Sequence, residues 1–150
     1  MEHSPVSESD DVIVCDTSGL IAFFDASDDH HAETCAAVEA DSGPFVVSPY
    51  VLAEVDCLLA SRRGPAAELA AISELAGGAW DLPCVEAIDL RRARSVIDQY
   101  RDQNIGLADA SLVVLADRYR TERLLTLDHR RFRVLRTRAG KTFTLLPADM

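Results

Sequence analysis

The chain has 150 residues, is 48% hydrophobic and carries a net charge of −10. This length is typical of one domain that buries its own core. No apolar run approaches the roughly 20 residues of a membrane-spanning helix, so we expect no membrane partner. Residues 1–11 are polar and acidic and lack the apolar core of a signal peptide. We expect them to be a disordered leader ahead of a single domain at residues 12–150.

The cysteine pattern argues against a zinc site and against a disulfide framework. Cys15, Cys35, Cys57 and Cys84 lie far apart in the sequence, with no pair at CxxC spacing. Such a pattern favours reduced, mostly buried thiols in a cytoplasmic protein.

Charge is distributed unevenly along the chain. Residues 1–61 hold 13 Asp and Glu and no Lys or Arg, whereas the remainder holds 12 acidic and all 15 basic residues. Nine of these basic residues fall within residues 118–141. The asymmetry indicates a basic face that can meet nucleic acid, beside an acidic region that can meet a metal ion or a basic partner. A solvated, arginine-rich helix face is the alternative.

Short β-branched or leucine-rich runs predict strands, and longer segments with apolar residues at helical spacing predict helices. In chain order we expect a strand at 12–15, a helix beginning at 20, a helix at 30–40, a strand at 45–47, helices at 50–63 and 66–76, an edge segment at 80–85, helices at 89–100 and 106–120, a strand at 124–127, a short helix at 131–135 and a strand at 143–146. This alternation predicts an α/β three-layer sandwich around a largely parallel sheet.

Four acidic residues share one kind of position. Asp16 and Asp128 each follow an apolar strand, while Glu54 and Asp109 each interrupt an apolar helix near its beginning. Strand ends and the starts of the following helices share one edge of a parallel sheet, so these carboxylates can converge there. Convergent carboxylates repel one another unless a cation neutralises them, and ligands that are all oxygen suit Mg²⁺ or Mn²⁺. Such a site is suited to phosphoryl chemistry.

Each acid also has a purely structural interpretation. Asp16 and Asp128 are good N-cap residues for the helices that follow them. Asp109 is favoured in the first turn of a helix by the helix dipole. Glu54 is then a solvated residue at the edge of an apolar stripe.

Four segments, at residues 14–20, 48–54, 106–111 and 125–128, resemble the acidic motifs of PIN-domain ribonucleases in order and approximate spacing. The resemblance extends over residues 12–147, and residues 1–11 depart from it. More narrowly, the chain resembles the VapC toxins of bacterial toxin–antitoxin pairs. Residues 46–55, 74–80 and 105–121 are most similar to VapC members that cut the sarcin–ricin loop of 23S ribosomal RNA.

This resemblance implies an endoribonuclease that depends on Mg²⁺ or Mn²⁺. Asp16 and Asp109 would bind the metal directly, and Glu54 and Asp128 would bind through water or orient the attacking water. The products would carry a 5′-phosphate and a 3′-hydroxyl. The implied partners are an rRNA or tRNA substrate, a VapB-type antitoxin and a second copy of the chain.

Further residues are candidates for binding at this site. Thr17 or Ser18 is placed to hydrogen-bond the Asp16 carboxylate or a phosphate. Backbone contacts to RNA, which weaken with salt, are expected from basic residues of the second half of the chain. The candidates are Arg118, Arg120, Arg130, Arg131 and Arg133.

Two alternatives belong to other functional classes. An α/β phosphatase or phosphoacceptor also places an aspartate after its first strand. Phosphatases of the haloacid dehalogenase type need a second aspartate two residues on, where this chain has Ser18, and a phosphoacceptor receiver needs a lysine after a late strand, whereas the only lysine is Lys141. The other alternative is an RNA-binding module without catalysis, against which the retention of all four acids argues.

Overall fold

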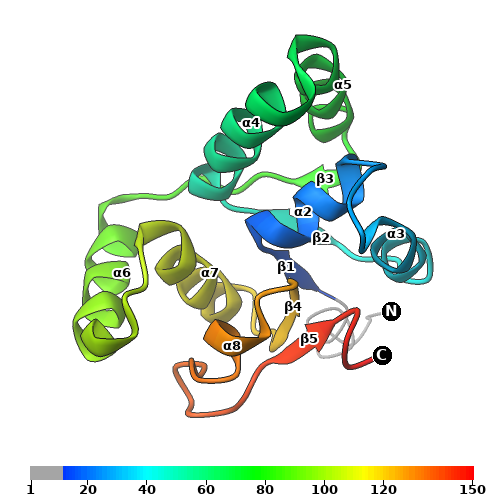
Figure 1. The fold of residues 1–150 in the computed structure, drawn as a ribbon. Helices are drawn as coiled ribbons and strands as arrows, with labels where there is room; N and C mark the ends of the chain where they lie inside the picture. Colours follow the sequence, from blue (N-terminus) through cyan, green and yellow to red (C-terminus); the bar gives the residue numbers. More distant parts are fainter. Residues whose placement is uncertain (1–11) are drawn as a thin grey trace, which may run out of the picture.

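A computed structural model describes residues 12–150 as a five-stranded sheet covered by helices (Figure 1). The strand order is β3-β2-β1-β4-β5, and every strand pairing is parallel. The strands are β1 (Ile13–Cys15), β2 (Phe45–Val47), β3 (Trp80–Asp81), β4 (Arg123–Leu125) and β5 (Thr144–Leu146). One antiparallel bridge, between Arg136 and Thr142, lies outside the strands.

Helices lie on both sides of this sheet. Within residues 12–150 they are α2 (Thr17–Phe24), α3 (His31–Glu39), α4 (Pro49–Arg63), α5 (Pro65–Leu75), α6 (Ala87–Gln99), α7 (Leu107–Arg118) and α8 (His129–Phe132), with a 3-10 turn at Arg101–Gln103. In Figure 1, α3 lies on one side of the sheet and α6, α7 and α8 on the other, while α4 and α5 form a hairpin that extends away from it. The predicted three-layer α/β sandwich is confirmed. None of the helices in residues 12–150 has the length and apolar character needed to span a bilayer.

The core is formed by the central strands and by α7. Strand β1 is buried along its whole length, and α7 is buried continuously from Asp109 to Ala116. Leu112 and Leu115 are fully buried in this helix. Because α7 is apolar on nearly all faces, it is stable only where other elements surround it. Its first turn, which carries Asp109, is therefore held rigidly in place.

Several predicted boundaries shift where the chain approaches the sheet edge. Strand β4 ends at Leu125 rather than at 127. The Thr126 N–H still donates to the Leu146 carbonyl at 3.0 Å, while its side chain bonds Asp16. Helix α2 begins at Thr17 rather than at 20. The edge segment forms only the two-residue strand β3, since Pro83 cannot donate to a ladder.

The cysteines form no disulfides, as predicted, but they are not mostly buried. All four thiols are free, but only Cys15 is buried, whereas Cys57 and Cys84 are exposed. Cys57 lies within α4 and Cys84 in the segment before α6, both on the surface. The predicted leader at residues 1–11 lies outside the described residues.

Gly19 permits a close approach between α2 and β4. A Cβ atom built there would lie 2.6 Å from the Leu125 carbonyl oxygen and 2.9 Å from its Cγ. Contacts this short do not occur, so a larger residue would push α2 away from the end of β4. The glycine thus brings the residues after β1 and those after β4 into contact.

Candidate active site

The four predicted carboxylates line one pocket of about 340 Å³. Asp16 directly follows β1, and Asp128 lies three residues after β4. Glu54 comes from the second turn of α4 and Asp109 from the first turn of α7. Parallel strands end at this edge of the sheet, which brings together residues more than a hundred positions apart.

Asp16 is buried and held by two hydroxyls. Thr126 donates to its Oδ2 at 2.8 Å, and Ser18 donates to the same oxygen at 2.9 Å. Each hydroxyl also accepts a backbone N–H, Thr126 from Asp128 at 3.0 Å and Ser18 from Leu127 at 2.9 Å. Because each hydroxyl has one proton, accepting from the backbone directs that proton onto Asp16. The carboxylate is therefore fixed in orientation.

Glu54 is oriented by the hydroxyl of Thr17, the residue between Asp16 and Ser18. The Thr17 Oγ1 donates to Glu54 Oε1 at 2.6 Å, which ties α4 to the start of α2. Glu54 is exposed. Its carboxylate thus faces solvent in a defined position, as a group that orients water needs to do.

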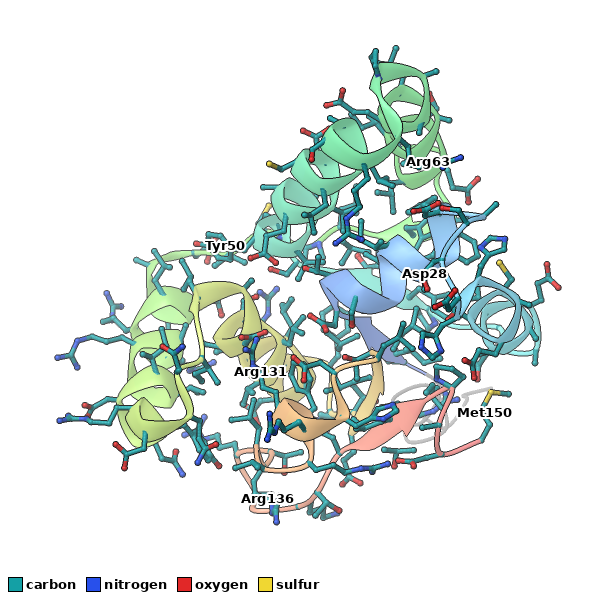
Figure 2. All side chains as sticks on the ribbon, in the orientation of Figure 1. Asp28, Tyr50, Arg63, Arg131, Arg136 and Met150 are labelled. Carbon is teal, nitrogen blue, oxygen red and sulfur yellow. The ribbon has the colours of Figure 1, made fainter. Side chains whose placement is uncertain are left out.

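Asp109 is paired with Arg131. The Arg131 Nη1 donates to Asp109 Oδ2 at 2.7 Å, and its Nε lies 3.6 Å from Asp128 Oδ2. In Figure 2, Arg131 lies where α8 meets α7. The carboxylates therefore have a counter-charge within the chain, which the sequence analysis did not predict. The reason is that α8 begins immediately after Asp128 and returns Arg131 to the pocket one helical turn later.

Burial raises the pKa of two of these acids. The pKa of Asp16 is raised mainly by burial and further by the nearby Asp109 charge, against the lowering effect of the Thr126 and Ser18 hydrogen bonds. The pKa of Asp109 is also raised by burial, which outweighs the lowering by Arg131, while Asp128 and Glu54 raise it further. The pocket therefore favours binding of positive charge.

The donor set suits a hard divalent cation. Among the described residues the pocket offers carboxylate and hydroxyl oxygens, and no His or Cys lines it. In the same residues, however, no three Asp, Glu, His or Cys side chains lie close enough together to hold an ion. Arg131 lies between Asp109 and Asp128, 2.7 Å from one carboxylate and 3.6 Å from the other.

The structural interpretations of the acids hold in three cases and fail in one. Glu54 is exposed as expected, although it also accepts a hydrogen bond from Thr17. Asp128 caps α8 by accepting the Arg131 N–H at 3.2 Å, and Asp109 accepts the Gly106 N–H at 3.4 Å. Asp16 occupies the N-cap position of α2 but makes no capping hydrogen bond with its side chain. A buried carboxylate that does not cap its own helix needs another role.

Three residues of the site were not predicted from the sequence: the buried Thr126 behind the pocket, and two residues that line it. Thr126 precedes Asp128 by two positions, a spacing that could have marked it as a ligand-orienting hydroxyl. Arg62 follows Glu54 by eight residues on α4, which places both on one helix face. Asp28 lines the pocket from the turn between α2 and α3, and no sequence pattern singles it out.

The five arginines proposed to bind RNA fall into two groups. Arg118 pairs with Asp89, Arg133 with Asp149, and Arg131 with Asp109. Among residues 12–150, Arg120 and Arg130 are exposed and form no ion pair or hydrogen bond through their side chains. Arg120 lies just after the end of α7 opposite to Asp109, whereas Arg130 is on α8 next to the pocket-lining Arg131.

The fold and the pocket define a PIN-type protein, and comparison with known proteins agrees. The model of the PIN domain family matches residues 13–137, and the chain belongs to this family. It is 49% identical over 135 residues to Ribonuclease VapC26 of Mycobacterium tuberculosis, covering 90% of this chain and 100% of that protein. The resemblance to VapC proteins seen in the sequence is thereby confirmed.

Solved structures share the fold at lower sequence identity. The crystal structure of Mycobacterium tuberculosis VapC20, described as a sarcin–ricin loop cleaving toxin, matches with a TM-score of 0.74 and 20% identity over 79% of this chain and 92% of that chain. A toxin–antitoxin complex from Klebsiella pneumoniae matches with a TM-score of 0.63 and 20% identity over 82% and 92%, respectively.

Proposed function

We propose that this protein is the toxin of a toxin–antitoxin pair and acts as an endoribonuclease that depends on Mg²⁺ or Mn²⁺. The observation that carries the proposal is the meeting of four carboxylates, from four separate segments, in one pocket at the carboxyl edge of the sheet. The 49% sequence identity between this chain and Ribonuclease VapC26, over 90% of this chain, supports the same activity.

In this proposal Asp16 and Asp109 would bind the metal ion directly. A metal ion bound there would polarise the scissile phosphate and lower the pKa of a bound water molecule. Ser18 and Thr126 keep Asp16 in the orientation it needs, since both hydroxyls donate to one of its oxygens. Glu54 and Asp128 bind through water or orient and deprotonate the attacking water. In-line attack by this water leaves a 5′-phosphate and a 3′-hydroxyl.

The proposed substrate is structured RNA, with the sarcin–ricin loop of 23S ribosomal RNA as the first candidate and tRNA as the second. The similarity in fold to a toxin that cuts this loop supports the choice. Arg62 lines the pocket, and Arg130 is the neighbour of the pocket-lining Arg131 on α8. Neither forms an ion pair among the described residues, so both are free to contact phosphates. Acidic residues elsewhere on the chain limit nonspecific binding.

The proposed partners are a VapB-type antitoxin and a second copy of the chain. A structural relative solved as a toxin–antitoxin complex supports the antitoxin. The exposed apolar residues Leu69 and Ile72 on α5, which are 64% and 43% exposed, support self-association. The four free cysteines suit the reducing cytoplasm.

The test is incubation of the purified protein with total cellular RNA, with and without Mn²⁺, followed by mapping of new 5′ ends. We expect few, defined cleavage sites that require metal and disappear in Asp109→Asn. Asp89→Asn is the matched control, because Asp89 is also a buried first-turn acid that accepts a backbone N–H and pairs with an arginine. RNA binding without new 5′ ends would favour the noncatalytic module instead.

A further inference from the structure

Arg131 lies on α8 and reaches the carboxylates of the pocket from this helix. Its backbone N–H donates to Asp128 Oδ1 at 3.2 Å, and its side chain then extends to Asp109 on α7. The guanidinium thus bridges two of the four carboxylates, at 2.7 Å from Asp109 and 3.6 Å from Asp128.

The bridge is partly accessible to water. The Arg131 side chain is 37% exposed, while the Asp109 side chain is 11% exposed. A guanidinium so placed can leave without any rearrangement of the core, whereas Asp109 is fixed in α7. The mobile member of the pair is therefore the arginine.

Arg131 already lies against the Oδ2 atoms of two carboxylates that the proposed function assigns to the metal site. In the described residues no three acidic side chains are close enough to hold an ion together, and the Arg131 guanidinium is the positive group paired with two of the four acids. A divalent ion bound to Asp109 would also repel a guanidinium held 2.7 Å from the same carboxylate.

We propose that Arg131 is an internal counter-cation that a divalent metal ion must displace from Asp109 and Asp128, so that this residue sets the metal affinity of the site. The inference rests on the proposed function, because it takes the four carboxylates as the metal site. Arg131 is thus a positioning residue that holds the acids in place when no metal is bound.

The experiment compares Mn²⁺ binding to the full-length wild type, Arg131→Gln, Arg131→Lys and Arg130→Gln by titration calorimetry. Arg130→Gln is the matched control: it removes one charge from the neighbouring position of the same helix, and Arg130 forms no side-chain pair in the described residues. We expect Arg131→Gln to bind Mn²⁺ about tenfold more tightly, the change that follows from loss of one competing charge-assisted hydrogen bond. Arg131→Lys, which cannot bridge both acids, should fall between.

A second readout separates displacement from a general loss of stability. In EDTA, Arg131→Gln should melt lower than the wild type, because Asp109 loses its partner, and saturating Mn²⁺ should raise its melting temperature by more than it raises that of the wild type. Equal Mn²⁺ affinities in Arg131→Gln and Arg130→Gln would overturn the inference. If the wild type itself neither binds Mn²⁺ nor cleaves RNA, the proposed function fails as well, whereas a wild type that does both leaves only the inference in question.

Discussion

The Thr126 hydroxyl donates to the Asp16 carboxylate at 2.8 Å across a separation of 110 residues. Both side chains are buried, and the bond links the segment after β1 to the segment after β4. The same hydroxyl accepts the Asp128 N–H at 3.0 Å, so one side chain positions two of the four acids.

Thr126→Val should therefore lower RNA cleavage by at least an order of magnitude. Valine keeps the shape but leaves the Asp128 N–H unpaired and removes a donor from a buried carboxylate, at a cost of about 1–3 kcal/mol in unfolding free energy. The measurements are initial cleavage rates and urea unfolding.

Thr121→Val provides the control for this prediction. Thr121 is also buried, donates to the Val12 carbonyl at 2.6 Å and accepts an N–H two residues on, from Arg123, at 3.1 Å. It lies at the opposite end of β4 from the pocket. We expect a similar loss of stability with normal cleavage by the folded protein. Equal activity losses in the two variants would mean that Thr126 acts through stability alone.

Gly19→Ala should destabilise the protein by about 1–3 kcal/mol, because its Cβ would lie 2.6 Å from the Leu125 carbonyl oxygen. Gly106→Ala is the comparison, since nothing lies within 4 Å of a Cβ there. That change should cost about 1 kcal/mol or less, as for other N-cap glycines replaced by alanine. Thermal unfolding of both variants measures the difference, and equal costs would argue against the close packing of α2 on β4.

The sequence predicted the sheet, the helix order and the convergence of the acids, because each rests on local patterns. Apolar runs and breaker residues define the elements, and the parallel sheet then places Asp16 and Asp128 on one edge. Glu54 and Asp109 follow from their positions near helix starts.

Pairing between side chains was less accessible to sequence reasoning. Arg131 and Asp109 are 22 residues apart, and their contact depends on where α8 lies relative to α7. Asp28 reaches the pocket only because the turn between α2 and α3 folds back toward it. Such contacts depend on the angles between elements, which apolar periodicity does not encode.

The raised pKa of Asp16 predicts a stability effect with a definite sign. Its ordinary value is 3.8, and burial raises the pKa in the folded protein. The folded state thus holds the proton more tightly, so the contribution of this group to stability is complete below about pH 4 and is lost as pH rises through the folded pKa. In EDTA, the wild type should lose stability relative to Asp16→Asn as pH increases from 4 to 7, measured by urea unfolding.

Asp149 supplies the opposite case within the same protein. Hydrogen bonds from Arg133 lower its pKa from 3.8 to about 2. Its contribution should persist at neutral pH and decline as pH falls from about 4 through 2.

For the Asp16 prediction, a wild type whose stability shows no pH dependence relative to Asp16→Asn would indicate that Asp16 is not desolvated in solution.

Metal binding should raise the melting temperature of the wild type and have little effect on Asp109→Asn. A ligand at a hundredfold excess over its Kd adds about 2.7 kcal/mol of stability. The substitution removes a buried carboxylate with a raised pKa, but it also costs Arg131 its partner. We therefore expect the unfolding free energy of this variant in EDTA to lie within about 1 kcal/mol of wild type, because a partly exposed ion pair contributes about that much.

Asp89→Asn again serves as the control for that experiment, and it should retain the full stabilisation by Mn²⁺. Differential scanning fluorimetry over a Mn²⁺ titration measures both variants. A clear gain in melting temperature for Asp109→Asn would remove Asp109 from the metal site and leave it as a helix cap and ion-pair partner.

Salt dependence of RNA binding should distinguish arginines that contact phosphate from those that are internally paired. Arg62 and Arg130 lie at or beside the pocket without side-chain partners in the described residues, whereas Arg118 and Arg133 are held by Asp89 and Asp149. Each phosphate contact contributes about 0.7–0.9 to the slope of log K against log salt. On an Asp16→Asn background that prevents cleavage, Arg62→Gln and Arg130→Gln should each make this slope shallower by about that amount. Arg118→Gln and Arg133→Gln should leave it unchanged, and the reverse pattern would move the RNA path away from the pocket toward the far end of α7.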